Sequence, residues 1–348
     1  MTPVELSRTV LHAVRRAVDA GELGVSVPAR AVVTPPGPGG CGDYATNIAL
    51  QLAKPAGQPP RRVAEVLRPY LVAVDGISDV VLTGPGFINI SLQSAAPAAL
   101  VEEILRRGPR YGYAEGPDGR IVQLHCPHDL RAVVVAEAAA RILRSQGALV
   151  RTSAEGFDPE WAAVLGVRVD VVGPAPAELP VTIRPVPAPG DPDPLRLGRD
   201  AARWALLHPA PHDRPRTGDE HLVQRESNPL FRVRYAHART RALSRNATDL
   251  GFVAEPGPVT GTAQDLLAAL GDHPRVLAAA AAHRAPDRLA RHLVTVADAA
   301  LPLLPTVLPR GAEKPSAAHR ARLALAEAVG AVLAGGLTLL GIDAPDHL

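Results

Sequence analysis

Apolar residues in the first third of the chain alternate between helical spacing and the short runs typical of strands. Apolar positions three and four residues apart predict helices near residues 4–20, 44–53, 61–73 and 95–107. Short runs rich in β-branched residues predict strands at 31–34, 80–83 and 87–92, the last two joined by the turn Gly84-Pro85-Gly86. The mixture of helices and strands predicts an α/β domain over residues 1–115.

A glycine-rich loop over residues 37–42 interrupts this pattern. Such a loop can hold phosphate through its backbone N–H groups. Here Pro35, Pro36 and Pro38 remove donors, and no Lys-Ser or Lys-Thr pair follows the loop. The composition therefore favours a flexible connection over a phosphate site.

Residues 116–215 begin with one β-α unit and then become rich in proline. A strand is predicted at 121–124 and a helix at 130–146, and helical spacing resumes only at 196–208. Eight prolines lie in the stretch from residue 174 to residue 194: Pro174, Pro176, Pro180, Pro185, Pro187, Pro189, Pro192 and Pro194. Proline disfavours helix interiors and central strands. The segment is therefore expected to form only a reduced domain.

Residues 216–348 show helical spacing throughout. Helices are predicted near residues 220–246, 262–270, 274–282, 286–304 and 316–340, which together make a helical bundle that can place Asp298 outward. The longest apolar stretch, 323–342, contains Glu327 and Gly335–Gly336, so it fits a buried bundle helix better than a membrane span. Arginines among the apolar positions near the first residue indicate an amphipathic helix rather than a targeting segment. A cytoplasmic protein without a membrane partner is expected.

Composition narrows the chemistry. The chain has 348 residues, a formal charge of +2 and 47% apolar residues, which is enough for ordinary cores. Of its 37 basic residues only Lys54 and Lys314 are lysines. Two cysteines, Cys41 and Cys126, exclude a disulfide framework and a four-cysteine zinc site. His125, Cys126 and His128 lie close together but lack a fourth ligand and suitable spacing, so no metal and no cofactor is expected.

Arginines cluster between residues 225 and 245, where few acidic residues interleave. On a helix, Arg234, Arg241 and Arg245 fall on one line, beside an apolar stripe that includes Phe231 and Tyr235. Unpaired arginines beside Tyr235 suit contacts with RNA phosphates and bases. A solvated basic face of a bundle helix would give the same pattern, so both interpretations stay open.

Several long motifs resemble those of arginyl-tRNA synthetases. Residues 42–49 (GDYATNIA), 52–55 (LAKP) and 84–92 (GPGFINISL) resemble the opening domain of that family. Residues 228–239 (NPLFRVRYAHAR) resemble its anticodon-domain signature, and residues 336–345 its closing segment. The resemblance covers roughly residues 1–150 and 195–348. It implies an N-terminal tRNA-corner domain over 1–115, a degenerate Rossmann-like remnant over 116–215, and an all-α DALR-type anticodon-binding bundle over 216–348.

The two signatures that the family uses to activate its amino acid with ATP are not recognisable. Cys126-Pro127-His128-Asp129 stands where the His-x-Gly-His loop belongs, and its aspartate would repel phosphates. No lysine lies between Lys54 and Lys314, so a Lys-rich loop of the KMSKS type cannot exist there. These departures predict a pseudoenzyme in which arginine activation is lost, with no catalytic residues to assign.

The resemblance implies that the chain binds tRNA, in particular arginine tRNA. The residues expected to contact it are Phe87, Asn89, Arg232, Arg234, Tyr235, Arg239, Arg241, Arg245 and Leu348. Phe87 and Asn89 equally allow a structural role, with Phe87 in the core and Asn89 capping the turn. Arginine stands at 232 and 234, and leucine at 348, where the family has an aromatic residue, an amide and methionine, which puts anticodon specificity in doubt. A residual or redirected ligase, and a scaffold that binds a true aminoacyl-tRNA synthetase or another protein, are the alternatives.

Overall fold

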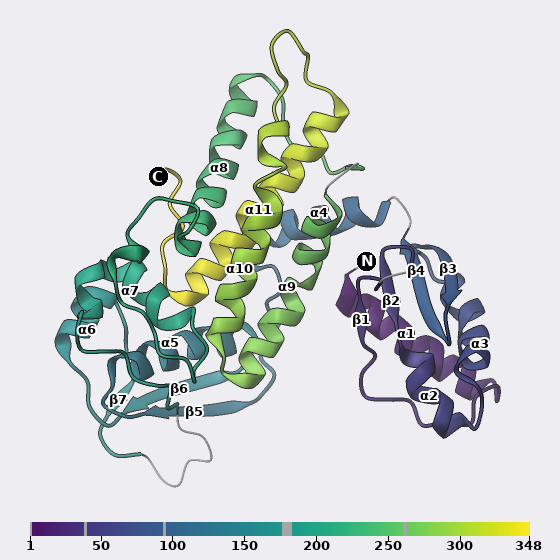
Figure 1. Ribbon diagram of the computed structural model, residues 1–348, viewed down its shortest axis with the longest axis horizontal. Helices are drawn as coiled ribbons and strands as arrows, with labels where there is room; N and C mark the ends of the chain where they lie inside the picture. Colours follow the sequence, from purple (N-terminus) through teal and green to yellow (C-terminus); the bar gives the residue numbers. More distant parts are fainter. Residues whose placement is uncertain (1, 38–39, 93–94, 176–182, 260–262) are drawn as a thin grey trace. The chain divides into compact units, whose positions relative to one another are not determined.

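The structure, a computed structural model, describes residues 2–37, 40–92, 95–175, 183–259 and 263–348 (Figure 1). Parts of the predicted glycine-rich loop, Pro176 and Pro180 of the proline-rich run, and residue 262 of a predicted helix lie outside the described residues. By its internal contacts the chain divides into two compact units, one of residues 1–102 and 256–272, the other of residues 103–255 and 273–348. The division into three domains at residues 115 and 215 stays a prediction.

The first unit is built on a four-stranded antiparallel sheet. Its order is β1-β2-β4-β3, with β1 (Val33–Thr34), β2 (Tyr44–Thr46), β3 (Ile77–Thr83) and β4 (Phe87–Leu92). The helices are α1 (Pro3–Asp19), α2 (Ile48–Ala56), α3 (Pro60–Val72) and the first part of α4 (Ala95–Arg107). The apolar stripe of α1, with Leu6 and Val10, packs into one core with Val63 of α3 and Ile88 of β4. The predicted α/β character of this region is confirmed.

The helix predicted over 44–53 is wrong in its first third. Residues Tyr44–Thr46 form β2, which pairs in antiparallel register with Ile88–Ile90, and the helix begins only at Ile48. The Thr46 hydroxyl accepts a hydrogen bond from the backbone N of Ile48 at 3.3 Å, which marks the change from strand to helix. Pairing with a strand that lies 42 to 46 residues further along the chain overrides local helical spacing.

The second unit contains a three-stranded parallel sheet. Its strands are β5 (Ile121–Cys126), β6 (Leu149–Ala154) and β7 (Val171–Val172), connected by α5 (Leu130–Ser145) and α6 (Pro159–Leu165). The sequence predicted a single β-α unit here, so β6, α6 and β7 are a correction. β6 mixes polar with apolar residues, and β7 is only two residues long, so neither gives a recognisable periodicity. The sheet remains a reduced Rossmann-like one.

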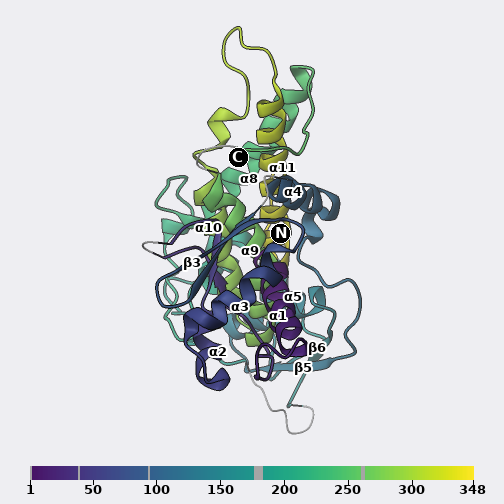
Figure 2. The ribbon, with the colours of Figure 1, turned by 90° about the vertical axis from the view of Figure 1, so that its right-hand side faces the viewer.

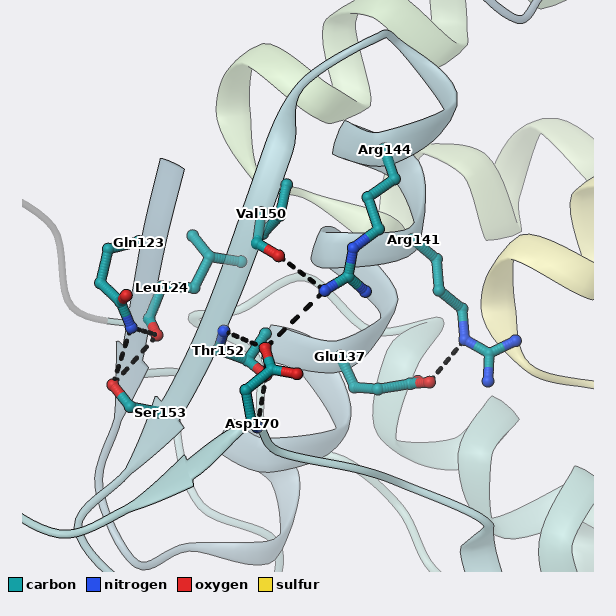
Figure 3. Close-up of polar contacts among 9 residues, drawn as sticks. All are labelled: Gln123, Leu124, Glu137, Arg141, Arg144, Val150, Thr152, Ser153 and Asp170. Atoms are coloured by element: carbon teal, nitrogen blue, oxygen red, sulfur yellow. Dashed lines mark hydrogen bonds and ion pairs between the residues drawn. The ribbon is translucent and has the colours of Figure 1, made fainter. Parts of the chain in front are cut away.

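Side-chain hydrogen bonds fasten the three strands together (Figure 3). Asp170, just before β7, accepts from the backbone N and hydroxyl of Thr152 at 2.6 and 2.9 Å. Gln123 Nε2 donates to Ser153 Oγ at 3.0 Å and so joins β5 to β6. These contacts stabilise short strands that the backbone ladder alone would hold weakly.

Helices fill the rest of the second unit. These helices are α7 (Gly198–Leu207), α8 (Pro229–Asp249), α9 (Gln264–His283), α10 (Pro286–Ala300) and α11 (Ala317–Leu340). Of α9, only residues 273–283 belong to this unit. The unit also contains four short 3₁₀ turns: η1 (Gly108–Arg110), η2 (Pro194–Leu197), η3 (Asp219–His221) and η4 (Leu304–Thr306). α8 starts at Pro229 rather than at 220, because the Asn228 side chain accepts from the backbone N of Leu230 and caps the helix there.

The two helices predicted at 262–270 and 274–282 are one continuous helix in the structure. α9 runs through Pro274 without a break. Proline removes one backbone donor, but Leu270 and Leu277 on either side of it are fully buried, so packing outweighs the lost hydrogen bond.

α11 is the apolar helix predicted near 316–340. It lies beside α8 in both views (Figures 1 and 2), and a Cβ at Gly330 would come within 2.6 Å of Thr240 Oγ1, so glycine permits this close approach. By length and composition the helix could cross a membrane, but 78% of its most apolar window is buried inside the protein. That burial matches the predicted bundle helix.

A histidine at the end of α7 makes the stability of the second unit depend on pH. The His208 ring stacks on Trp204 with centroids 5.0 Å apart, and burial, followed by the positive charge of Arg291, lowers the His208 pKa from 6.5 to about 4. Between pH 6.5 and 4 the unfolded chain therefore binds a proton that the folded chain does not, so stability falls as the pH falls. Urea unfolding at pH 4.5 should give a free energy about 2 kcal/mol lower than at pH 7 from this residue.

His208→Gln separates this contribution from that of other groups. The variant cannot take up the proton, so its free energy of unfolding should decline less steeply between pH 7 and 4.5 than that of the parent. Identical pH profiles for the two proteins would contradict the assignment to His208.

Candidate nucleic-acid interface

One face of α8 carries the predicted arginines, and the opposite face is buried. Val233 and Ala236 are fully buried, whereas 39% of Tyr235 and about half of the Arg241 side chain are exposed. Tyr235 stacks on Phe231 with ring centroids 5.6 Å apart and planes 22° apart. The helix thus presents a partly exposed aromatic stripe beside its arginines, as the spacing predicted.

The expectation that these arginines are unpaired is wrong for three of them. Arg232 Nε lies 3.1 Å from Asp298 Oδ1 of α10, and Arg234 Nη2 lies 3.5 Å from Asp200 Oδ2 of α7. Arg241 Nε donates to Asp346 Oδ1 at 2.9 Å. All three acids lie far from the arginine run in sequence, so a count of acids within the run could not find them.

Arg239 differs from these neighbours. In the part of the chain that the structure describes, its guanidinium makes no ion pair or hydrogen bond. With Tyr235 and Arg245 it lines a cavity of 200 Å³ that residues 346–348 close on one side. Arg239 is therefore the arginine of α8 that is most directly available to an anion.

The segment after α11 returns along α8 (Figure 1). Gly341 adopts a left-handed conformation (φ 71°) that ends α11, and Ile342 is buried. His237 Nδ1 lies 3.0 Å from Pro345 O, and Arg245 Nη2 lies 3.4 Å from Asp346 O and 3.3 Å from His347 Nδ1. The structure thus brings Arg241, Arg245 and Leu348 together, and it adds Asp346 and His237, which sequence reasoning missed.

A larger cavity of 330 Å³ lies where α8 begins, and it is lined by residues from α7, the turn before α8 and the last segment. Arg199, Phe231, Arg234 and Leu348 contribute to its wall. Asp200 holds this region together, because its Oδ1 accepts from the backbone N of Asp343 at 3.1 Å while its Oδ2 faces Arg234. Guanidinium groups, a ring face and an apolar tip around such a volume can accommodate an unstacked base.

Phe87 and Asn89 of β4 behave differently from each other. Phe87 is 41% exposed, so it is available for a contact rather than placed in the core. Asn89 is buried: its Nδ2 donates to Val81 O at 3.2 Å and Thr83 Oγ1 at 2.7 Å, and its Oδ1 accepts from Cys41 N at 3.4 Å. Asn89 therefore fastens β4 to β3 and to the loop before β2, and Phe87 carries the exposed surface of the pair.

The residues that replace the expected ATP loop lie at the carboxyl end of β5. Asp129 caps α5, since its Oδ1 accepts from Ala132 N at 2.8 Å. His125 is buried with its Nδ1 2.8 Å from Ser153 Oγ, and its backbone O accepts from Ile183 N at 2.8 Å. Burial raises the pKa of the Cys126 thiol to about 12, so the thiol is protonated and unreactive at neutral pH. Among the described residues, no three His, Cys, Asp or Glu side chains are grouped so that they could hold a metal ion.

Arg131, in the first turn of α5, is fully buried. All five N–H donors of its guanidinium meet backbone carbonyls: Nε donates to Leu206 O, Nη1 to Val186 O and Asp213 O, and Nη2 to Pro209 O and Ala210 O, at 2.7 to 3.1 Å. One side chain thus fixes a proline-rich connection that has little regular structure of its own. The pattern around Arg131 gave no sign of this role.

α5 carries a second buried charged residue, Glu137, which pairs with Arg203 of α7. Glu137 of α5 accepts from Arg203 of α7 and from Arg141, and Arg203 also donates to Leu340 O at 2.8 Å (Figure 3 shows Glu137 and Arg141). Both Glu137 and Arg203 are buried, so each compensates the charge of the other. These contacts join α5, α7 and the end of α11.

Two family models match the chain. Residues 5–92 match the model described as "Arginyl tRNA synthetase N terminal domain", and residues 233–348 match the model described as "DALR anticodon binding domain". The second match contains most of α8 and the whole segment that returns along it.

Named relatives agree with these matches. A protein named Arginine--tRNA ligase from Renibacterium salmoninarum is 28% identical over 556 aligned positions that cover 100% of both chains. This chain has 348 residues, so at least 208 of the 556 aligned positions are gaps in this chain. The Arginine--tRNA ligase of Kineococcus radiotolerans is 39% identical over 163 positions, which are 43% of this chain and 29% of the relative.

Solved structures show the same fold. The arginyl-tRNA synthetase of Thermus thermophilus superposes with a TM-score of 0.71 at 16% identity, covering 100% of both chains. The enzyme of Plasmodium falciparum gives 0.70 at 9% identity over 99% of both chains.

Proposed function

Because the chain belongs to the arginyl-tRNA synthetase family, we propose that it is a non-catalytic member that binds tRNA, in particular arginine tRNA. Binding would use the exposed face of α8 in the anticodon-binding domain, with a second contact from the N-terminal domain. The observation that carries the binding half of this proposal is the arrangement of Arg239 and Arg245 around the exposed ring of Tyr235. A planar guanidinium beside an aromatic face can hold a phosphate while a base stacks.

Within this proposal the contact residues are those that remain on the surface. Arg239, Tyr235, Arg241 and Arg245 would face the anticodon loop, with Arg234 and Leu348 at the neighbouring cavity. Arg232 pairs with Asp298 and lines neither of the two cavities, so it would hold α8 against α10 rather than contact a base. Phe87 would make the contact of the N-terminal domain with tRNA. Asn89 would hold β4, which carries Phe87, against β3 through its hydrogen bond to Val81 O.

Loss of catalysis is supported by the first turn of α5 and by the lysine count. A helix N-terminus favours phosphate, but here the carboxylate of Asp129 already accepts from Ala132 N and adds negative charge. The backbone N of Ile183 donates to His125 O at 2.8 Å near the carboxyl end of β5, and doubly wound folds bind their ligands at the carboxyl ends of the strands. No lysine lies between Lys54 and Lys314, so no lysine of that range can place its charge on a triphosphate. The named relatives are ligases, so residual ligase activity is the main competing proposal.

Binding without activation is the result that tests the proposal. Arginine tRNA should bind at least about tenfold more tightly than an unrelated tRNA at ~150 mM salt, with an affinity that falls steeply as salt rises. The same preparation should give no arginine-dependent exchange of pyrophosphate into ATP, because the charges that stabilise the transferred phosphates are absent.

Each alternative has its own outcome in this pair of measurements. Exchange that requires arginine would identify a ligase and refute the loss of catalysis. Equal and weak binding of both tRNAs, without exchange, would favour a scaffold that binds a protein such as a true synthetase.

A further inference from the structure

The segment that follows α11 lies on the same arginines that the proposed function assigns to RNA. Asp346 offers its carboxylate to Arg241 Nε at 2.9 Å, and its backbone carbonyl lies 3.4 Å from Arg245 Nη2. His347 Nδ1 is 3.3 Å from the same Arg245 nitrogen. In the free protein, two of the arginines that would meet phosphates are therefore already partnered by an internal acid and its neighbour.

The base of this segment is firmly held. Ile342 is buried, Asp343 N donates to Asp200 Oδ1 at 3.1 Å, and Pro345 O lies 3.0 Å from His237 Nδ1. His237 itself is buried, and burial lowers its pKa, so its neutral ring donates one hydrogen bond here. Residues up to Pro345 are thus fixed on the bundle by contacts that do not involve the arginine face.

The tip of the segment is held only by surface contacts. The side chains of Asp346 and Arg241 are 53% and 52% exposed, and Leu348 is 51% exposed. An ion pair with this exposure is weak and is screened by salt. An RNA presents several phosphates at once, and its binding releases counterions condensed on those phosphates, which favours the complex. An RNA phosphate can therefore replace the Asp346 carboxylate at Arg241.

We infer that Asp346 and His347 form a displaceable cover, which we call the acidic cover, that competes with RNA phosphates for Arg241 and Arg245. The inference rests on the proposed function, since it regulates the same face of α8. The cover lowers the affinity for RNA and leaves Arg239 as the first arginine that a phosphate meets. Binding then displaces Asp346 from Arg241, so the free and RNA-bound states differ in the position of this tip.

Asp346→Asn tests the acidic cover by removing its charge and keeping its size. The affinity for arginine tRNA at ~150 mM salt should rise about threefold to tenfold, and the salt slope should steepen by about one, because one more arginine is free to release a counterion. Asp249→Asn is the matched control: it removes the same charge from the end of α8, where that side chain has no hydrogen bond or ion pair among the described residues. The control should change the affinity less than twofold.

A double-mutant cycle shows whether the effect passes through Arg241. In an Arg241→Gln background the Asp346→Asn substitution should no longer raise the affinity, because the paired arginine is gone. An unchanged affinity of Asp346→Asn, or an equal gain in Asp249→Asn, would overturn the acidic cover while leaving tRNA binding by the parent intact. Absence of RNA binding in the parent and all variants would overturn the proposed function, and the cover with it.

Discussion

Replacing Arg131 by methionine should lower the free energy of unfolding of the second unit by about 3–5 kcal/mol. The guanidinium is fully buried and its five donors satisfy five backbone carbonyls. Methionine fills a similar volume but donates nothing, so those carbonyls would be buried without partners. Urea unfolding followed by circular dichroism measures the loss.

Two comparisons separate this effect from a change of charge. Arg214→Met removes the same charge at an exposed position and should change the free energy of unfolding by less than about 0.5 kcal/mol. Arg131→Lys keeps the charge but has a different donor geometry, so it should remain destabilised by about 2 kcal/mol or more. A stable Arg131→Met protein would show that the connection over 186–213 holds itself without this side chain.

Local spacing predicted most of the elements whose stability comes from one amphipathic face. α1, α3, α4, α5, α10 and α11 lie close to their predicted ranges, because each of them buries apolar residues that recur at helical spacing. The boundaries that were wrong depend on distant partners. β2 exists because Tyr44–Thr46 pairs with Ile88–Ile90, and β7 because it pairs with Ser153 and Ala154 of β6.

The candidate site shows the same limit more sharply. Helical geometry placed Arg241 and Arg245 on one line, and the structure brings both to one short segment. The acids that partner the arginines come from α7, α10 and the segment after α11, at separations of 34 to 105 residues, where no local rule could pair them. Sequence therefore identifies which side chains share a face, and only the tertiary structure tells which of them are already engaged.

Replacing Arg239, Arg241 and Arg245 together by alanine should weaken the binding of arginine tRNA about 100-fold at ~100 mM salt. Each arginine that contacts a phosphate of a single-stranded loop adds about 0.7 to the salt slope, so the slope should fall by about two. Arg239 and Arg245 line the cavity beside Tyr235, the Arg241 side chain is half exposed, and none of the three is among the buried residues of α8. Filter binding over a range of salt concentrations measures both the affinity and the slope.

A charge-matched triple variant decides whether position or net charge carries the binding. Arg168, Arg214 and Arg216 are exposed in the second unit, and their guanidinium groups have no ion pair within the described residues, so alanine at all three makes the same change in charge. If RNA binding depends on the face of α8, this control loses less than about threefold in affinity and keeps its salt slope. An equal loss in both triples would mean that RNA responds to the overall charge of the protein, and α8 would then have no special part in recognition.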